Sequence, residues 1–137
     1  DKYILKEEDI PVKRVIATTS APGAVGPYSQ AIEANGFVFV SGQLPLDPAT
    51  GAFVSDNTAE QAEQSIKNLL AVLEAAGCKA EDVVKTTVFM IDIGDFSVVN
   101  EVYAKYFSGD CPARCAMQVS ALPKGALVEI EAIAVKP

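Results

Sequence analysis

The sequence predicts an α+β two-layer sandwich, in which two helices cover one face of a mixed or mostly antiparallel β-sheet. Two observations lead to this fold class. The expected elements follow one another as strand, strand, helix, strand, helix, strand, strand. The chain has 137 residues, of which 50% are apolar and 21% charged, the balance of a globular protein with one core. We therefore expect an N-terminal arm at residues 1–20 and a single domain at residues 21–137.

The first strands are predicted from a turn signal. A short strand is expected at residues 13–17, followed by a loop rich in glycine and proline. Asn35-Gly36 separates two β-prone runs, 30–34 and 37–41, and is typical of a two-residue hairpin turn. Gly42 should end the second run, and turn residues fill 44–57.

The first helix is expected at residues 58–76. Thr58 and Gln61 fit a capping box, and Gly77 is placed to end the helix in the left-handed conformation. Apolar residues recur at helical spacing along one stripe: Ala62, Ile66, Leu69, Leu70, Leu73 and Ala76.

The second half of the chain alternates strands with one more helix. Residues 83–92 are rich in β-branched side chains and predict a central strand. Asp95 is expected to cap a helix through Phe107, with Gly109 after its end. Its inward stripe comprises Phe96, Val99, Tyr103 and Tyr106. Two last strands, 115–121 and 127–135, are expected around a turn at 123–125.

Two helices can cover only one face of this sheet. The other face is expected to carry Phe37, Phe39, Val88 or its neighbours, and the alternating strand at 127–135. A half-apolar face without a helix should be buried by another subunit, so the pattern predicts a homo-oligomer.

Charge and composition exclude several classes of function. A net charge of −7 argues against a nucleic-acid-binding surface. The absence of histidine excludes Ser-His-Asp and Cys-His catalysis and removes the commonest metal ligand. No apolar run approaches the roughly 18 residues that a membrane helix needs, and no signal peptide is apparent. We expect a cytoplasmic protein without a membrane partner.

The three cysteines do not form a recognisable framework. Cys78, Cys111 and Cys115 are an odd number, and three thiols without an imidazole are a poor zinc site. The expectation is reduced, buried thiols and no metal. Cys115 lies beside Arg114, whose cation would lower a thiol pKa, but a nucleophilic role lacks a base partner.

The candidate site residues are an arginine and a pair of glutamates. Arg114 opens a strand of small and apolar residues, so its guanidinium either grips a ligand carboxylate or forms a salt bridge to Glu129 or to a neighbouring chain. Glu129 and Glu131 alternate in the last strand and point to one face, which is either a solvated face or a cleft containing a general base. Tyr28 and Ser41 lie beside glycine-rich bends, as turn residues or as pocket donors.

Taken as strings, these segments are more specific. The chain from about Ala21 to its C-terminus resembles the RidA (YjgF) family of enamine/imine deaminases, in order and without large gaps. The strings that carry the resemblance are GPYSQ at 26–30, VSGQLP at 40–45, VKTTVF at 84–89, CPAR at 111–114, LP at 122–123 and VEIEA at 128–132.

The resemblance implies a chorismate-mutase-like fold and a homotrimer whose sheets line the interior, with clefts between adjacent subunits. It implies hydrolysis of 2-imino acids such as 2-iminopropanoate and 2-iminobutanoate to 2-oxo acids and ammonia. This activity is a form of metabolite damage control, because such imines leak from pyridoxal-phosphate enzymes, and it needs neither metal nor organic cofactor.

The resemblance also implies residue roles. Arg114 corresponds to the carboxylate clamp and Glu129 to the residue that holds or activates water, with Tyr28, Ser41 and Gly42 supplied by the neighbouring subunit. Asn100 and Phe96 are expected nearby. The chain departs from the family pattern after the arginine, where Cys115 and Ala116 replace the usual Ser or Thr and Cys, and where Gln118 replaces a common Glu. A substrate-contacting role for Cys115 is therefore an open prediction.

Three functions remain at this point. The first is an imine deaminase, and the second is a non-catalytic module that binds 2-oxo or short carboxylic acids and regulates a partner. The third is an endoribonuclease or translation inhibitor, an activity attributed to some relatives of the family, against which the acidic balance argues.

Overall fold

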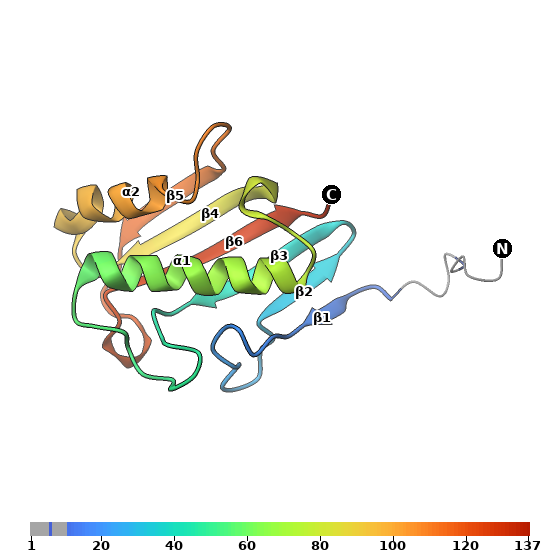
Figure 1. Cartoon of the computed structure of the whole chain (residues 1–137), viewed down its shortest axis with the longest axis horizontal. Coiled ribbons are helices and arrows are strands. Elements are labelled where there is room, and N and C mark those ends of the chain that lie inside the picture. Colours follow the sequence, from blue (N-terminus) through green and yellow to red (C-terminus); the bar gives the residue numbers. More distant parts are fainter. Residues whose placement is uncertain (1–5, 7–10) are drawn as a thin grey trace.

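The computed structural model describes Lys6 and residues 11–137. Its six strands form one mixed sheet in the order β1-β2-β3-β6-β4-β5, and both helices lie on one side of it (Figure 1). The fold is the predicted α+β two-layer sandwich. The strands and helices are β1 (Arg14–Ile16), β2 (Ala31–Ala34), β3 (Phe37–Gln43), α1 (Thr58–Ala75), β4 (Val83–Met90), α2 (Phe96–Ala104), β5 (Ala113–Gln118) and β6 (Val128–Val135).

The β2–β3 hairpin turns at the predicted dipeptide. Asn35 has a φ of 53° and Gly36 a φ of 82°, the left-handed values that a two-residue hairpin turn needs. The expectation that Gly42 ends the second strand is wrong, because β3 continues to Gln43. The pairing with β6 shifts register between Val40 and Gln43, so Gly42 lies in an irregular part of the strand.

Helix α1 confirms the predicted apolar stripe but not the predicted cap. Asn57 is the N-cap, and its side chain accepts a hydrogen bond from the backbone N–H of Glu60. Thr58 is the first helical residue instead, and its hydroxyl donates to Asp95 Oδ2 at 3.1 Å. Gln61 does not form a capping box. Its side-chain Nε2 donates to the carbonyl of Ser55, and its Oε1 accepts from the backbone N–H of Leu127.

The remaining boundaries differ by a few residues. β4 is an interior strand as expected, but it ends at Met90. α2 ends at Ala104 rather than Phe107, and the Asp95 side chain makes no capping hydrogen bond. β5 starts at Ala113, two residues earlier than predicted, and pairs in parallel with β4.

The two faces of the sheet are distinguished by burial. The face under the helices contains the core, including Val88, which is fully buried there. Of the expected alternatives, Val88 or its neighbours, it is the neighbours Thr87 and Phe89 that alternate to the open face. Phe37 and Phe39 lie on the open face as predicted and remain 41% and 44% exposed. A half-exposed aromatic face therefore remains on this chain.

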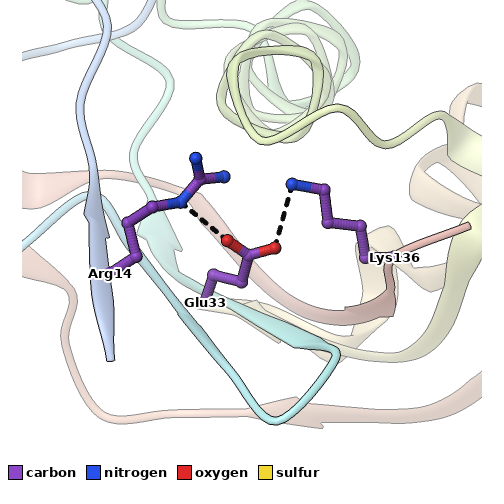
Figure 2. A network of polar contacts seen from close by, with 3 residues as sticks. All are labelled: Arg14, Glu33 and Lys136. Atoms are coloured by element: carbon purple, nitrogen blue, oxygen red, sulfur yellow. Dashed lines mark ion pairs between the residues drawn. The ribbon is translucent and has the colours of Figure 1, made fainter. Parts of the chain in front are cut away.

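A polar cluster ties the first strand to the C-terminal end. The Glu33 carboxylate on β2 accepts from Arg14 Nε on β1 at 2.7 Å and from Lys136 Nζ at 2.9 Å (Figure 2). Three segments that are distant in sequence therefore meet at one side chain.

The cysteines differ from expectation. All three are free, and Cys78 is buried, but Cys111 and Cys115 are exposed. The prediction of buried thiols therefore holds for one of the three. Neither helix in the described part of the chain is long and apolar enough to cross a membrane.

Candidate functional site

The predicted site residues fall into two groups on opposite faces of the sheet. Arg114 pairs with Thr86, which in turn pairs with Ala132, so these three side chains share the face under the helices. Glu129 alternates with the buried Val128 and Ile130 and therefore points to the open face. Within one chain, the arginine and the glutamate do not meet.

The first group surrounds Arg114 on the face that α2 covers. Phe96, Asn100 and Tyr103 stand at positions i, i+4 and i+7 of α2, so they form one stripe that faces β5. The Arg114 Nη1 donates to Asn100 Oδ1 at 2.7 Å. Its Cζ lies 5.4 Å from the centroid of the Phe96 ring and 5.0 Å from that of Tyr103, which are cation–π distances.

This arrangement leaves most of the arginine's hydrogen-bonding capacity free. A guanidinium carries five N–H donors, and within residues 11–137 only the bond to Asn100 uses one of them. No ion pair joins Arg114 to Glu129 or to another carboxylate of the described chain. The intrachain salt bridge considered from the sequence is therefore not observed, and the exposed fork is available to an external anion.

The second group lines a cavity of about 550 Å³ near the C-terminal end of β3. A space of this size suits a small metabolite. Four residues that were predicted for the site line this cavity: Tyr28, Ser41, Gly42 and Glu129. Glu131, Gln30 and Lys124 line it as well.

Glu129 is the chemically distinctive residue of this cavity. Burial raises its pKa above the ordinary glutamate value, and the nearby Glu131 carboxylate raises it further. A carboxyl group whose pKa moves toward neutrality is better suited to exchange protons with water than an ordinary surface glutamate.

Gly42 lies directly against this carboxylate. A Cβ at position 42 would lie 2.5 Å from Glu129 Oε1 and 2.9 Å from Glu129 Cδ. The φ of Gly42 is not in the left-handed region, so its constraint is space rather than backbone conformation.

The loop that carries Tyr28 is held by a residue that the sequence did not single out for the site. Gln30 is 5% exposed, and its amide donates to the carbonyls of Thr18 at 3.0 Å and Pro22 at 2.8 Å. Its Oε1 accepts from the N–H of Thr18 at 2.7 Å. A glutamine at the start of a predicted strand does not indicate this role, because its partners Thr18 and Pro22 lie in an irregular loop. Ser41 adds a bond to the carbonyl of Ser29.

Cys115 is separated from Arg114 although it is adjacent in sequence. Consecutive strand residues point to opposite faces, so the thiol lies on the open face opposite Thr87. Its contact is Lys85, whose Nζ donates to Sγ at 3.4 Å. The cation beside the thiol is therefore lysine rather than arginine. No group of three or more metal-ligating side chains occurs among the residues that the structure describes.

Comparison with known proteins places these groups in a family context. Residues 18–136 match the family model described as Endoribonuclease L-PSP. The chain is 52% identical over 125 residues to the 2-iminobutanoate/2-iminopropanoate deaminase of Homo sapiens, which covers 91% of each chain.

Solved structures give the same result for the fold. RidA from the Antarctic bacterium Psychrobacter is 48% identical, with a TM-score of 0.86 over 89% of this chain and 98% of that one. TdcF of E. coli, solved with bound serine, is 42% identical, with a TM-score of 0.86 over 90% of this chain and 99% of that one.

Proposed function

This chain belongs to the Endoribonuclease L-PSP family, known also as the RidA (YjgF) family, and on that premise we propose that it is a hydrolytic deaminase. Its substrates are reactive 2-imino acids or their enamine tautomers, such as 2-iminopropanoate and 2-iminobutanoate. The products are the 2-oxo acid and ammonia.

The observation that carries the proposal is the free guanidinium fork of Arg114. A 2-imino acid is a small anion whose planar carboxylate suits two parallel hydrogen bonds from arginine. Asn100 uses one donor of the fork and leaves the others for the ligand. The arginine stays charged at every physiological pH, so the clamp does not depend on the protonation that the chemistry uses.

The reaction needs only a held carboxylate, a placed water and a proton carrier. Water adds to the carbon of the protonated imine and loses a proton, giving a neutral tetrahedral carbinolamine. The amine nitrogen then takes a proton and leaves as ammonia, while the hydroxyl loses its proton and its C–O bond becomes the carbonyl. Glu129 takes the first proton as a base and supplies the second as an acid, a cycle that its raised pKa favours. Hydrolysis of this kind neither oxidises nor reduces the substrate.

We infer that the complete site requires two copies of the chain. Arg114 with Asn100, and Glu129 with Tyr28, Ser41 and Gly42, occupy opposite faces of one sheet. A crevice shared by neighbouring subunits of a homotrimer would bring the two groups together. The exposed phenylalanines of the open face support such an assembly, since contact with another sheet would bury them.

The test is loss of an imine produced in situ by an amino-acid oxidase. The wild-type protein should accelerate it, and Arg114→Ala should lower kcat/KM by about 100-fold or more, the range for removing one partner of a hydrogen-bonded charge pair. Arg114→Lys, which keeps the charge without the fork, should fall between them. Unchanged activity in Arg114→Ala would remove the clamp assignment.

The same variants separate this function from its alternatives. A non-catalytic module would be thermally stabilised by a 2-oxo acid but would not turn the imine over. Cleavage of RNA is disfavoured, because 18 acidic residues oppose 11 basic ones and the cavity contains two glutamates.

The three free thiols agree with a cytoplasmic location.

A further inference from the structure

We propose that Tyr103 is a positioning residue for Arg114, and that its hydroxyl bond to Thr86 fixes the ring against which the guanidinium rests. The inference deepens the proposed function, because it concerns how the carboxylate clamp is oriented before substrate arrives.

The hydroxyl pair lies inside the core. Thr86 on β4 is fully buried, and Tyr103 on α2 is 6% exposed. Their hydroxyl oxygens are 2.8 Å apart, so each supplies the hydrogen-bond partner that the other needs once water is excluded. The bond joins a helix to the strand beside β5.

The same ring contacts the guanidinium. Arg114 Cζ lies 5.0 Å from the centroid of the Tyr103 ring. The Tyr103 ring also packs against the Phe107 ring, with 4.6 Å between the two centroids. The ring is therefore held at its hydroxyl by Thr86 and beside its plane by Phe107. Asn100 fixes one edge of the guanidinium at 2.7 Å, and the aromatic contact restrains its plane.

Restraint of this kind favours ligand binding. An arginine side chain has many rotamers, and freezing them on binding opposes affinity. A guanidinium that is already oriented loses less freedom when the carboxylate arrives.

Core packing alone does not explain the polar pair. Thr86 shares its buried face of β4 with Val88 and Met90, and valine would have the shape of threonine there. Replacing both members of a buried hydrogen-bonded pair with apolar groups of the same shape is often nearly neutral for stability. The hydroxyls do, however, fix the ring's position beside Arg114, which a Val–Phe pair would not.

The experiment compares four variants in two measurements. Tyr103→Phe and Thr86→Val each break the hydroxyl bond and keep the volume, Tyr103→Leu removes the ring, and Thr86→Ser is the conservative control. Steady-state kinetics use 2-iminobutanoate made in situ, and calorimetry measures the Kd of 2-oxobutanoate.

We expect KM and Kd to rise about tenfold in Tyr103→Leu, and about threefold in Tyr103→Phe and Thr86→Val, in line with the range of cation–π and positioning effects. The kcat should change less than about twofold in all of them. Thr86→Ser should remain close to wild type. In an Arg114→Ala background, Tyr103→Phe should leave the weakened Kd unchanged, because the group that it positions is gone.

The outcomes separate the two proposals. If the wild type turns over the imine and Tyr103→Leu retains its KM and Kd, the positioning role is wrong and the deaminase stands. Equal effects of Tyr103→Phe with and without Arg114 would likewise overturn the positioning role. If the wild type binds 2-oxobutanoate without turnover, the deaminase is wrong, and the Kd series still decides the role of Tyr103.

Discussion

Gly42 shows how a single missing side chain shapes the candidate site. A Cβ there would come within 2.5 Å of the Glu129 carboxylate oxygen, which is closer than any tolerated contact. The atom in the way is the end of a flexible side chain, so relief by moving the carboxylate is easier than moving the backbone. We predict that Gly42→Ala folds with near wild-type stability and loses most of its deaminase activity, measured by thermal unfolding and by imine turnover.

A double variant checks the cause of that loss. In a Glu129→Ala background the obstructing side chain is absent, so Gly42→Ala should reduce the residual activity no further. A further tenfold loss in that background would show that Gly42 acts through something other than Glu129.

The pKa of Glu129 leads to a prediction for the pH profile. Burial is the larger cause of its upward shift and Glu131 the smaller. If ionised Glu129 is the base, kcat/KM should rise with pH through a midpoint above the ordinary glutamate pKa of about 4.3. Glu131→Gln should move this midpoint to lower pH without bringing it to the ordinary value, because burial persists. An acid limb unaffected by Glu131→Gln would argue against this assignment.

The same shift has a consequence for stability. A carboxyl group whose pKa is raised by folding contributes its stability below the unfolded-state pKa and loses it as pH rises through the folded value. Glu129 is therefore a destabilising group at neutral pH. We predict that Glu129→Gln raises Tm at neutral pH and that the gain disappears below about pH 3, where the carboxyl group is protonated in both the folded and the unfolded state. Calorimetric scans across pH measure this, and a gain that is independent of pH would contradict it.

At the scale of elements, most of the fold could be predicted because the signals are local. The Asn35-Gly36 turn and the apolar stripe of α1 need only neighbours in sequence. The cap of α1 could not be assigned in the same way. Thr58 and Gln61 fit a capping box in the sequence, but both side chains bond to residues distant in sequence. The Thr58 hydroxyl donates to Asp95, and the side-chain oxygen of Gln61 accepts from the N–H of Leu127. Asn57 is then left to cap the helix.

Glu33 links three elements by charge, which gives a prediction at this scale. The hydrogen bond from Lys136 is the main cause of its lowered pKa, and the charges of Arg14 and Lys136 add to it, while burial opposes it. A lowered carboxyl pKa contributes stability above the unfolded-state value, and this is lost as pH falls through the folded value. Glu33→Gln should therefore lower Tm at neutral pH, and the difference from wild type should vanish in acid. Equal Tm differences at both pH values would indicate a packing effect instead.

At the scale of the whole molecule, the candidate residues could be identified from the sequence, but not which face of the sheet each of them lies on. Nearly all of them were identifiable from the strings that carry the family resemblance. Whether Arg114 and Glu129 share a face depends on how β5, β4 and β6 pair, because a shift of one residue would reverse the face of either side chain. Arg114 pairs with Thr86, and Thr86 pairs with Ala132, so Arg114 lies on the face of the sheet opposite to Glu129. Only the long-range register of these strands determines that.

This partition predicts complementation between two inactive variants. In the proposed homotrimer, Arg114→Ala keeps the Glu129 group and Glu129→Gln keeps the Arg114 group, so neither variant alone should be active. Subunits mixed during refolding should form some crevices with an intact arginine from one copy and an intact glutamate from its neighbour. Random assortment at equal concentrations makes about one crevice in four complete, so recovery of about a quarter of wild-type activity is expected.

The double variant carrying both substitutions is the matched control. Mixed with wild-type subunits, it adds no functional group, whereas mixing the single variants creates intact crevices from two inactive parents. Light scattering on each mixture confirms that the assembly state is the same throughout. If the mixed single variants remain inactive in assemblies of normal size, the arginine and the glutamate do not act across a subunit boundary, and the two groups on opposite faces of the sheet cannot be halves of one active site.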